Sequence, residues 1–251
     1  MQYADMKVYT WRAILIAALM LCVGNGYAEI LFQDDFESGK IDEGKWTPQG
    51  SWIIENNDDK HDVLGNKVLD VWGGGVGLSA DDFPEEFDYY ADFKTMDGGL
   101  TGFVFHGADG NNIYMHQVST AGSGHTPQHI RWHRRVGGGW TAEPGAFVDK
   151  EDRDQNVWYR VKFEVRENYK FKAYLGDVGV EDADLALVSE WTDSAKSFEQ
   201  GKIGFRMSGG NRAGEHAQYD NIVVATPGFD IFPVESKDKL AVMWGKLKNK
   251  R

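Results

Sequence analysis

Two acidic stretches, one near each end of the chain, hold side chains whose types could do chemistry. In "AQYDNIVVA" (217–225), Asp220 and Asn221 begin an apolar run that is typical of a buried β-strand. A carboxylate in such a place needs a cation, backbone donors or water to offset its desolvation. A second acidic stretch, "FQDDFES" (32–38), lies far upstream. The fold decides whether the two stretches meet.

The apolar residues between these stretches recur with a period of two rather than 3.6. Segments of strand length alternate or run apolar, and Gly and Asn or Asp pairs separate them. Many short strands with frequent turns predict one all-β domain over 29–226, an antiparallel β-sandwich or jelly roll. The segments are 67–72, 100–107, 112–118, 129–134, 157–166, 169–176 and 203–209.

The first 28 residues predict export. Positive charge precedes the apolar run "AILIAALMLCV", and "GNGYA" ends in small residues, which is the pattern of a secretory signal peptide cleaved near Ala28. The apolar run is much shorter than the roughly 20 residues that cross a bilayer, so no transmembrane anchor is expected. We therefore expect a secreted or periplasmic protein.

Composition narrows the range of partners. The formal net charge is −12, which argues against nucleic acid and anionic lipid as main partners and is compatible with neutral sugars and divalent cations. The one cysteine, Cys22, lies in the signal peptide. The exported protein would have no disulfide, so its stability must come from a hydrophobic core.

An ordered set of motifs resembles the concanavalin A-like lectin/glucanase superfamily, near its laminin-G-like bacterial domains, fructan-binding modules and 3-keto-disaccharide hydrolases. The resemblance covers about residues 30–225 and implies a concanavalin A-like jelly roll. The motifs are "LFQDDFESGKIDEGKWTPQGSWIIE", "VLDVW", "LTGFVFHGADGNNIYMHQV", "WYRVKFEVRENYKFKAYLGD" and "GKIGFRMSGGNRAGEHAQYDNIVV".

The same resemblance implies a structural Ca²⁺ between the first and last strands. Asp35 matches the family's early acidic ligand, Asp220 matches the Asp of its final D-N-I/V-x-V motif, and Gly65 is the candidate for a carbonyl ligand. Hard oxygen ligands of this kind suit Ca²⁺. The alternative is that both aspartates bond backbone amides. Further candidate ligands are Asp34, Glu37 and Asn221.

Strand alternation predicts which side chains line the concave sheet that the resemblance implies. If Phe103 and Phe105 point into the core, alternate residues of this strand and its neighbours point outward. Aromatic rings that cover sugar C–H faces, with Arg and His to bond hydroxyls, would make a carbohydrate site. The candidate residues are His106, Tyr114, His116, Arg131, His133, Arg206 and, on a loop, Trp140.

The resulting hypothesis is a non-catalytic, lectin-like carbohydrate-binding module. A glycoside hydrolase of the 3-keto-disaccharide type and an adhesive or scaffold domain that binds protein are the alternatives. The E-x-D-x-x-E motif of retaining glucanases is absent from the sequence. A pair of carboxylates in the concave groove would favour the enzyme, whereas aromatics and Arg without such a pair would favour the lectin.

The C-terminal segment 227–251 differs from the rest. A linker precedes "VESKDKLAVMWGKLKNKR" (234–251), in which apolar residues recur at helical spacing and the end is basic. This pattern predicts a short amphipathic helix that docks on the acidic domain, on a partner or on an anionic membrane surface.

Overall fold

The computed structural model describes residues 28–59, 63–123, 130–148, 153–209 and 211–229. The predicted signal peptide and the predicted C-terminal helix lie outside the described residues. Within the described ranges, no helix has the length and apolar character needed to cross a membrane.

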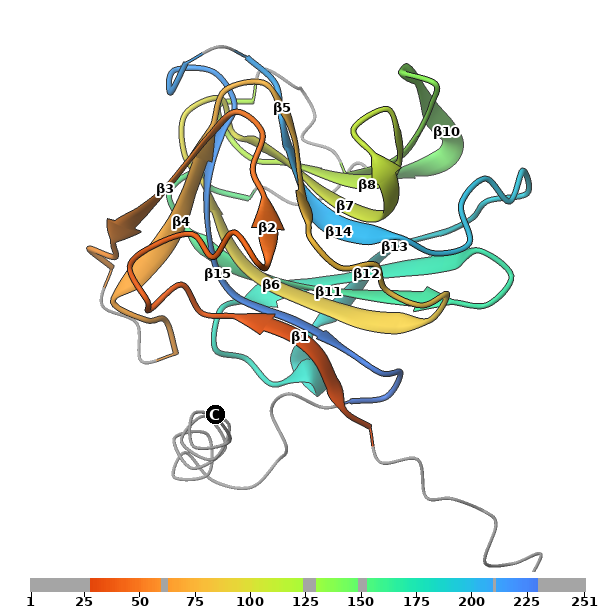
Figure 1. The fold of residues 1–251 in the computed structure, drawn as a ribbon, viewed down its shortest axis with the longest axis horizontal. Helices are drawn as coiled ribbons and strands as arrows, with labels where there is room; N and C mark the ends of the chain where they lie inside the picture. The colour runs from red at the N-terminus through yellow and green to blue at the C-terminus, as the bar shows by residue number, and fades with distance from the viewer. Residues whose placement is uncertain (1–27, 60–62, 124–129, 149–152, 210, 230–251) are drawn as a thin grey trace, which may run out of the picture.

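Two antiparallel sheets face one another (Figure 1). The eight-stranded sheet has the order β13-β12-β11-β6-β15-β4-β3, with β1 paired to β15 beside that path. Its strands are β13 (Ala186–Thr192), β12 (Lys170–Asp177), β11 (Trp158–Arg166), β6 (Phe87–Thr95), β15 (His216–Ala225), β4 (Lys67–Trp72), β3 (Ser51–Asn56) and β1 (Ile30–Asp34).

The seven-stranded sheet has the order β10-β9-β8-β7-β14-β5-β2. In Figure 1 its strands β10 and β5 rise on either side of β7 and β14, so the outer face of this sheet is cupped. Its strands are β10 (Gly139–Val148), β9 (Ile130–Val136), β8 (Asn112–Ser119), β7 (Leu100–Asp109), β14 (Lys202–Met207), β5 (Gly75–Ser79) and β2 (Trp46–Thr47). A 3₁₀ turn, η1 (Asp182–Asp184), precedes β13.

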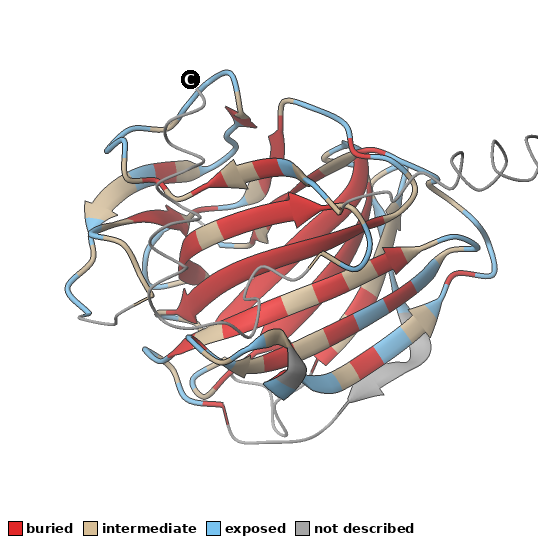
Figure 2. Cartoon of the chain, turned by 90° about the horizontal axis from the view of Figure 1, so that it is seen from below, coloured by how far each residue is buried: buried red, intermediate tan, exposed pale blue. Residues whose placement is uncertain are grey.

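The predicted β-sandwich is confirmed, and the predicted segments agree with the strands to within one or two residues at most ends. The alternation that predicted them persists as a burial pattern. In β12, for example, every second residue from Phe171 to Leu175 is buried. In Figure 2 the central strands are buried along most of their length, whereas strands toward one edge alternate buried and exposed residues.

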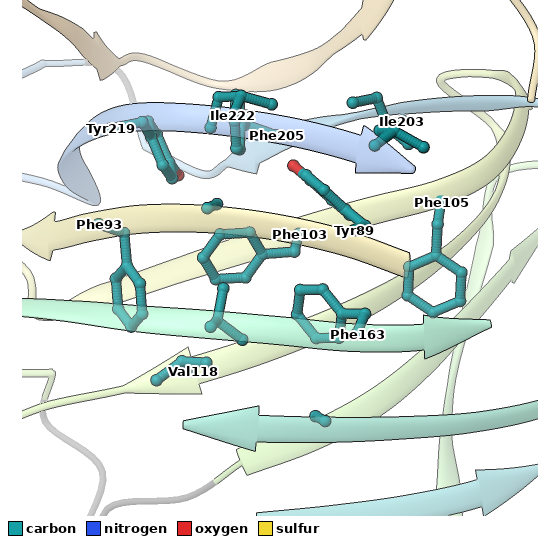
Figure 3. Packing of buried hydrophobic residues seen from close by; sticks show 14 of the residues in the cluster. Tyr89, Phe93, Phe103, Phe105, Val118, Phe163, Ile203, Phe205, Tyr219 and Ile222 are labelled. Atoms are coloured by element: carbon teal, nitrogen blue, oxygen red, sulfur yellow. The ribbon is translucent and has the colours of Figure 1, made fainter. Parts of the chain in front are cut away.

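Aromatic side chains fill the space between the sheets (Figure 3). Phe205 stacks on Tyr219 with ring centroids 3.8 Å apart, and Phe103 meets both sheets, with Phe163 at 5.4 Å. Such pairs add about 0.5–1.5 kcal/mol each to the free energy gained from burial. Trp46 and Trp52 lie in this core, whereas Trp158 is buried on the outer side of the eight-stranded sheet with Val68 and Val178.

That outer side also buries charged side chains in pairs. The guanidinium of Arg160 donates two hydrogen bonds of 2.7 Å to the carboxylate of Asp92, and both residues are almost fully buried. Arg166 contacts the buried Asp88 at 2.5 Å. These pairs fix β6 against β11, because burial of either charge alone would be strongly unfavourable.

Candidate functional site

Cross-strand register places polar side chains in one row on the cupped face of the seven-stranded sheet. Arg206 of β14 pairs with Gly102 of β7, Gly102 pairs with Gln117 of β8, and Gln117 pairs with Arg131 of β9. Phe103 and Phe205, which alternate with this row, point into the core. The row therefore faces outward. Its two arginines, Arg206 and Arg131, are separated by Gly102, which has no side chain, and by Gln117, which has an amide.

The next row along the sheet is apolar in its middle. Val104 pairs with Met115, and Met115 pairs with His133. Val104 and Met115 belong to a second apolar cluster with Val76, Leu78 and Ile113, on the side away from the main core. A Cβ at Gly102 would lie 2.5 Å from the sulfur of Met115, so Gly102 is needed for the methionine to lie across β7.

Trp140 of β10 lies among the cations of this face. Its ring centroid is 5.0 Å from the Arg135 guanidinium, 5.3 Å from that of Arg206 and 5.8 Å from the His133 ring. The indole is 37% exposed. Because Arg206 is four strands away in the sheet order, these contacts bring β10 over the floor of the cup. We call Trp140, His133, Arg131, Arg135, Arg206 and Gln117 the cup cluster.

His133 has an unusual environment. Neither ring nitrogen has a hydrogen-bond partner among the described residues, although both are buried. Burial, and then the charges of Arg131 and Arg206, lower the pKa of His133 to about 4. The imidazole is therefore neutral at physiological pH, and one nitrogen is an acceptor and the other a donor.

Two acidic side chains reach the rim of the cup. Glu215 contacts Arg206 at 3.4 Å, but its carboxylate is held mainly by Ser208, whose backbone N–H donates to it at 2.6 Å. Asp109 accepts from the backbone N–H of Asn111 at 2.6 Å in the β7–β8 turn, and this bond, with those from Asn112 and the charge of Arg135, lowers the pKa of Asp109.

Four of the seven predicted site residues lie on this face, namely Arg131, His133, Trp140 and Arg206. The prediction that Tyr114 and His116 face outward is wrong. Register pairs Tyr114 with Phe105 and His116 with Phe103, so both side chains point into the core. The His116 ring packs 4.4 Å from Trp132, and its Nε2 lies 3.0 Å from the Ser189 hydroxyl.

The prediction that His106 faces outward is also wrong. This residue has a φ of 47° at the start of a register shift in β7, and that conformation ends the regular alternation. Its ring is buried 5.4 Å from Phe87, and Nδ1 lies 3.1 Å from the carbonyl oxygen of Phe198. Burial lowers the pKa of His106 to about 4.

Sequence reasoning missed Arg135 and Gln117. Arg135 follows Arg131 and His133 at spacing two, so strand alternation alone would have placed it on the same face. Its guanidinium donates to the carbonyl oxygens of Gly110 at 2.5 Å and Gly138 at 3.1 Å, which fixes it at the rim.

The two acidic stretches do meet, on the outer side of the eight-stranded sheet. β15 pairs with β4 through residues 216–219 and with β1 through residues 222–225. Asp220 lies between these segments, followed by Asn221 with a φ of 48°. The buried carboxylate of Asp220 accepts from the backbone N–H groups of Gly65 at 2.9 Å and Asn221 at 2.8 Å.

Asp220 has no cationic partner among the described residues, in contrast to its neighbour Asp92. Burial raises the pKa of Asp220 well above its ordinary value, and the charges of Asp92 and Glu37 add to the shift. Glu37 accepts from the backbone N–H of Lys67 at 2.8 Å and lies where a Cβ of Gly65 would be, at 2.2 Å. The buried carboxylate of Asp220 therefore lies near the carboxylate of Glu37, and a cation between them would stabilise both negative charges.

The other candidate ligands are placed less favourably. Asp35 accepts from the backbone N–H of Glu37 at 3.3 Å, and the Gly65 carbonyl accepts from Asn57 at 3.0 Å. Asp34 shares the core side of β1 with Phe32 and accepts from the Trp46 indole, and Asn221 donates its amide to Asp92. The described residues contain no group of three or more His, Cys, Asp or Glu side chains arranged to hold a metal.

A hollow of about 860 Å³ lies elsewhere, beside the β11–β12 hairpin. Across its strands Lys172 pairs with Glu164 on one side and with Glu190 on the other, so opposite charges alternate. This pattern is typical of a solvated sheet edge. The lining of the hollow also includes the aromatic residues Phe171 and Trp191.

No protein-family model and no curated protein matches this sequence. Solved structures do match the fold. The carbohydrate-binding module CBM66 from Bacillus subtilis has a TM-score of 0.53 at 22% identity over 72% of this chain and 96% of its own. Lectin UEA-II, complexed with galactose, has a TM-score of 0.51 at 13% identity over 80% of this chain and 98% of its own.

An enzyme has a similar fold as well. Xylan β-1,4-xylosidase from Bacillus halodurans has a TM-score of 0.53 at 10% identity, over 76% of this chain and 38% of its own. These likenesses show the fold, an antiparallel β-sandwich of the jelly-roll kind that the sequence motifs implied. They span binding proteins and an enzyme, so the function has to be argued from the residues of the site.

Proposed function

We propose that this protein binds carbohydrate, without cleaving it, through the cup cluster on the seven-stranded sheet. The observation that carries the proposal is Trp140 held among Arg135, Arg206 and His133, above an outward row of Arg and Gln side chains. An aromatic ring can cover the apolar face of a sugar, while guanidinium and amide groups bond its hydroxyls. The similarity of the fold to CBM66 and to a lectin supports this choice.

The acidic groups of the cup favour binding over hydrolysis. Glycoside hydrolysis commonly needs two carboxyl groups that flank the scissile bond. Among the described residues of this face, Glu215 is tied to Ser208 and Asp109 is tied to its own turn. The cup is also not a flat apolar surface of the kind a protein-binding domain would present.

The test is a glycan array followed by isothermal titration of the best ligand. Trp140→Ala should abolish most of the binding. The matched control is Trp72→Ala, because Trp72 also stacks with an arginine, Arg212 at 4.2 Å, but on the other sheet. Equal loss in both variants, or no ligand on the array, would contradict the proposal. Release of shorter sugars from a bound oligosaccharide would instead establish the hydrolase.

We also propose a structural Ca²⁺ at the junction of β1, β4 and β15. The uncompensated carboxylate of Asp220, with Glu37 beside it, supports the proposal, and Asp35 and the Gly65 carbonyl are the remaining candidate ligands. Carboxylate and carbonyl oxygens are the donors that Ca²⁺ prefers. When bound, the ion would supply positive charge that stabilises the junction of the first and last strands.

Thermal unfolding in EDTA and in Ca²⁺ tests this second proposal. Ca²⁺ should raise the midpoint by several degrees in the wild type and not in Asp220→Ala. Asp42→Ala is the control, since Asp42 caps an exposed turn by accepting from Gly44 at 2.9 Å and should leave the Ca²⁺ response unchanged. An identical midpoint in EDTA and Ca²⁺ for the wild type would show that Asp220 only bonds backbone amides.

A further inference from the structure

The geometry of the cup cluster depends on an acidic side chain that is not a member of it. The guanidinium of Arg206 lies 5.3 Å from the ring centroid of Trp140, although β14 is four strands away from β10 in the sheet order. A long arginine side chain loses rotamer freedom when it is kept in one such position. The group that holds Arg206 against the indole therefore contributes to the site.

Glu215 is the acidic partner of Arg206 among the described residues. Its Oε2 lies 3.4 Å from Nη1 of Arg206, and only 16% of the Glu215 side chain and 22% of the Arg206 side chain are exposed. Burial lowers the pKa of Arg206, and the charge of Glu215 opposes that shift. The carboxylate therefore offsets part of the cost of keeping a guanidinium in this half-buried place.

Glu215 is itself fixed by Ser208. The backbone N–H of Ser208 donates to Oε2 of Glu215 at 2.6 Å, and the Ser208 hydroxyl donates to Oε1. In return, the backbone N–H of Glu215 donates to the carbonyl oxygen of Ser208 at 3.3 Å. Gly209 has a φ of 100°, a conformation that favours glycine, so the chain can turn directly after Ser208. These bonds hold the carboxylate within reach of Arg206.

From this series of contacts we infer that Glu215 is a positioning residue for carbohydrate binding. It does not touch the sugar, and it holds Arg206 against Trp140 before the ligand arrives. The inference rests on the proposed function and adds a residue to that site. A side chain that is already ordered loses less conformational freedom on binding, and this saving corresponds to about three- to tenfold in affinity.

The eight-stranded sheet carries a similar series of groups. Glu55 is ion-paired with Arg212, and the guanidinium of Arg212 lies 4.2 Å from the ring centroid of Trp72. This carboxylate, arginine and tryptophan lie on the other outer face, away from the cup. Glu55→Gln therefore makes the same chemical change as Glu215→Gln in a matched setting where no effect on binding is expected.

The experiment measures, by calorimetry on the full chain, the affinity for the best ligand from the glycan array. Glu215→Gln keeps the size of the side chain and removes the charge that attracts Arg206, so we expect a loss of about three- to tenfold. Ser208→Ala removes the hydroxyl and keeps the backbone donor, so a smaller loss is expected. Glu55→Gln should bind as tightly as the wild type.

A double-mutant cycle distinguishes positioning from a general loss of structure. If Glu215 acts through Arg206, Glu215→Gln should weaken binding no further in a chain that already carries Arg206→Gln. In the sugar-free protein, the NMR signal of the Trp140 indole N–H should shift in Glu215→Gln and not in Glu55→Gln, because only the first change releases the guanidinium from this ring.

Unchanged affinity in Glu215→Gln would overturn the inference and leave carbohydrate binding in place. Tighter binding would also overturn it, because Glu215 would then compete with the sugar for Arg206. Equal losses with and without the Arg206 side chain would assign Glu215 a structural role only. A wild-type chain that binds no sugar would instead overturn the proposed function, and this inference with it.

Discussion

The two sheets of the sandwich present charged side chains on their outer faces in opposite ways. On the eight-stranded sheet, the buried carboxylates of Asp92 and Asp88 have Arg160 and Arg166 as partners, and Asp70 accepts from His216 at 2.5 Å and from Arg212 at 2.6 Å. On the seven-stranded sheet, Arg135 of the cup cluster donates to the carbonyl oxygen of Gly110 and lies over the Trp140 indole, and Arg206 lies over the same indole and contacts Glu215 at 3.4 Å. The first face holds its charges in buried pairs, whereas the second holds two guanidinium groups against an exposed aromatic ring.

This difference separates a structural role from a binding role. Charged side chains that are buried in ion pairs hold neighbouring strands together, and their hydrogen-bonding groups are already occupied and do not reach a ligand. Cations that are only partly offset, around an exposed aromatic ring, keep a capacity to bind. The exception on the eight-stranded sheet is Asp220, and for that reason the proposed Ca²⁺ belongs at this carboxylate.

The largest expected effect is on the structural face. Arg160→Met leaves the Asp92 carboxylate buried without its cation and should reduce the free energy of unfolding by about 3–5 kcal/mol. The double variant Asp92→Asn/Arg160→Met should recover a substantial part of that loss. Urea denaturation measures both, and sugar binding by the folded fraction should be unchanged. A loss below 1 kcal/mol would show that the pair is not a stabilising contact.

The next largest effect is a pH dependence of the unfolding free energy that arises from the buried His106. His106 has a folded pKa of about 4, below its unfolded value of about 6.5, so the folded state prefers the neutral ring. The associated stability is fully present above pH 6.5 and is lost as the pH falls toward 4, by up to about 3 kcal/mol. His106→Asn, which tolerates the positive φ, should flatten the fall in unfolding free energy over this window. An unchanged pH profile would contradict the buried neutral ring.

A smaller effect is expected on the binding face. Trp140→Ala should weaken sugar binding by roughly 1–3 kcal/mol, a factor of about 5–150, and should change the unfolding free energy little because the residue is 37% exposed. Calorimetry and urea denaturation on the same sample separate the two effects. A variant that unfolds more easily and binds normally would reverse the roles assigned to the two faces.

The smallest effect tests the floor of the cup. Gly102→Ala adds a methyl group 2.5 Å from the Met115 sulfur, which a flexible methionine can avoid by moving toward the ligand space. We expect a few-fold loss of affinity and a modest loss of stability. Gly139→Ala is the control, because a Cβ there meets nothing closer than 3.5 Å. Unchanged affinity in Gly102→Ala would place the ligand away from this row.

The strands could be predicted well from the sequence because the alternation of apolar and polar residues is a local pattern. The predicted segment 67–72, for example, has the same bounds as β4. It did not determine which alternate set faces the core. In β8, Ile113 and Met115 are as apolar as Tyr114 and Val118, and all four are buried because both faces of the strand are covered. Tyr114 and His116 were assigned to the wrong face for this reason. In β7 the φ of His106 ended the alternation, which no periodic pattern reveals.

Other features were within reach of sequence reasoning. The family resemblance implied that Asp220 and the Gly65 carbonyl lie close together, and in the structure Asp220 does reach Gly65, although it accepts from the backbone N–H at 2.9 Å. Contacts such as Trp140 with Arg206 depend on how far β10 curls over the sheet. That curvature is a property of the whole sheet and cannot be derived from the spacing of residues along one strand.

The most direct test of the binding site is an NMR titration in which a sugar that binds the protein is added stepwise. The titration follows the indole N–H signals of Trp140 and Trp72, which lie on the outer faces of the two different sheets. If the cup is the binding site, the Trp140 signal shifts in proportion to binding while the Trp72 signal stays in place. A shift of Trp72 alone, or binding without a shift of Trp140, would contradict the claim that the cup of the seven-stranded sheet is the binding site.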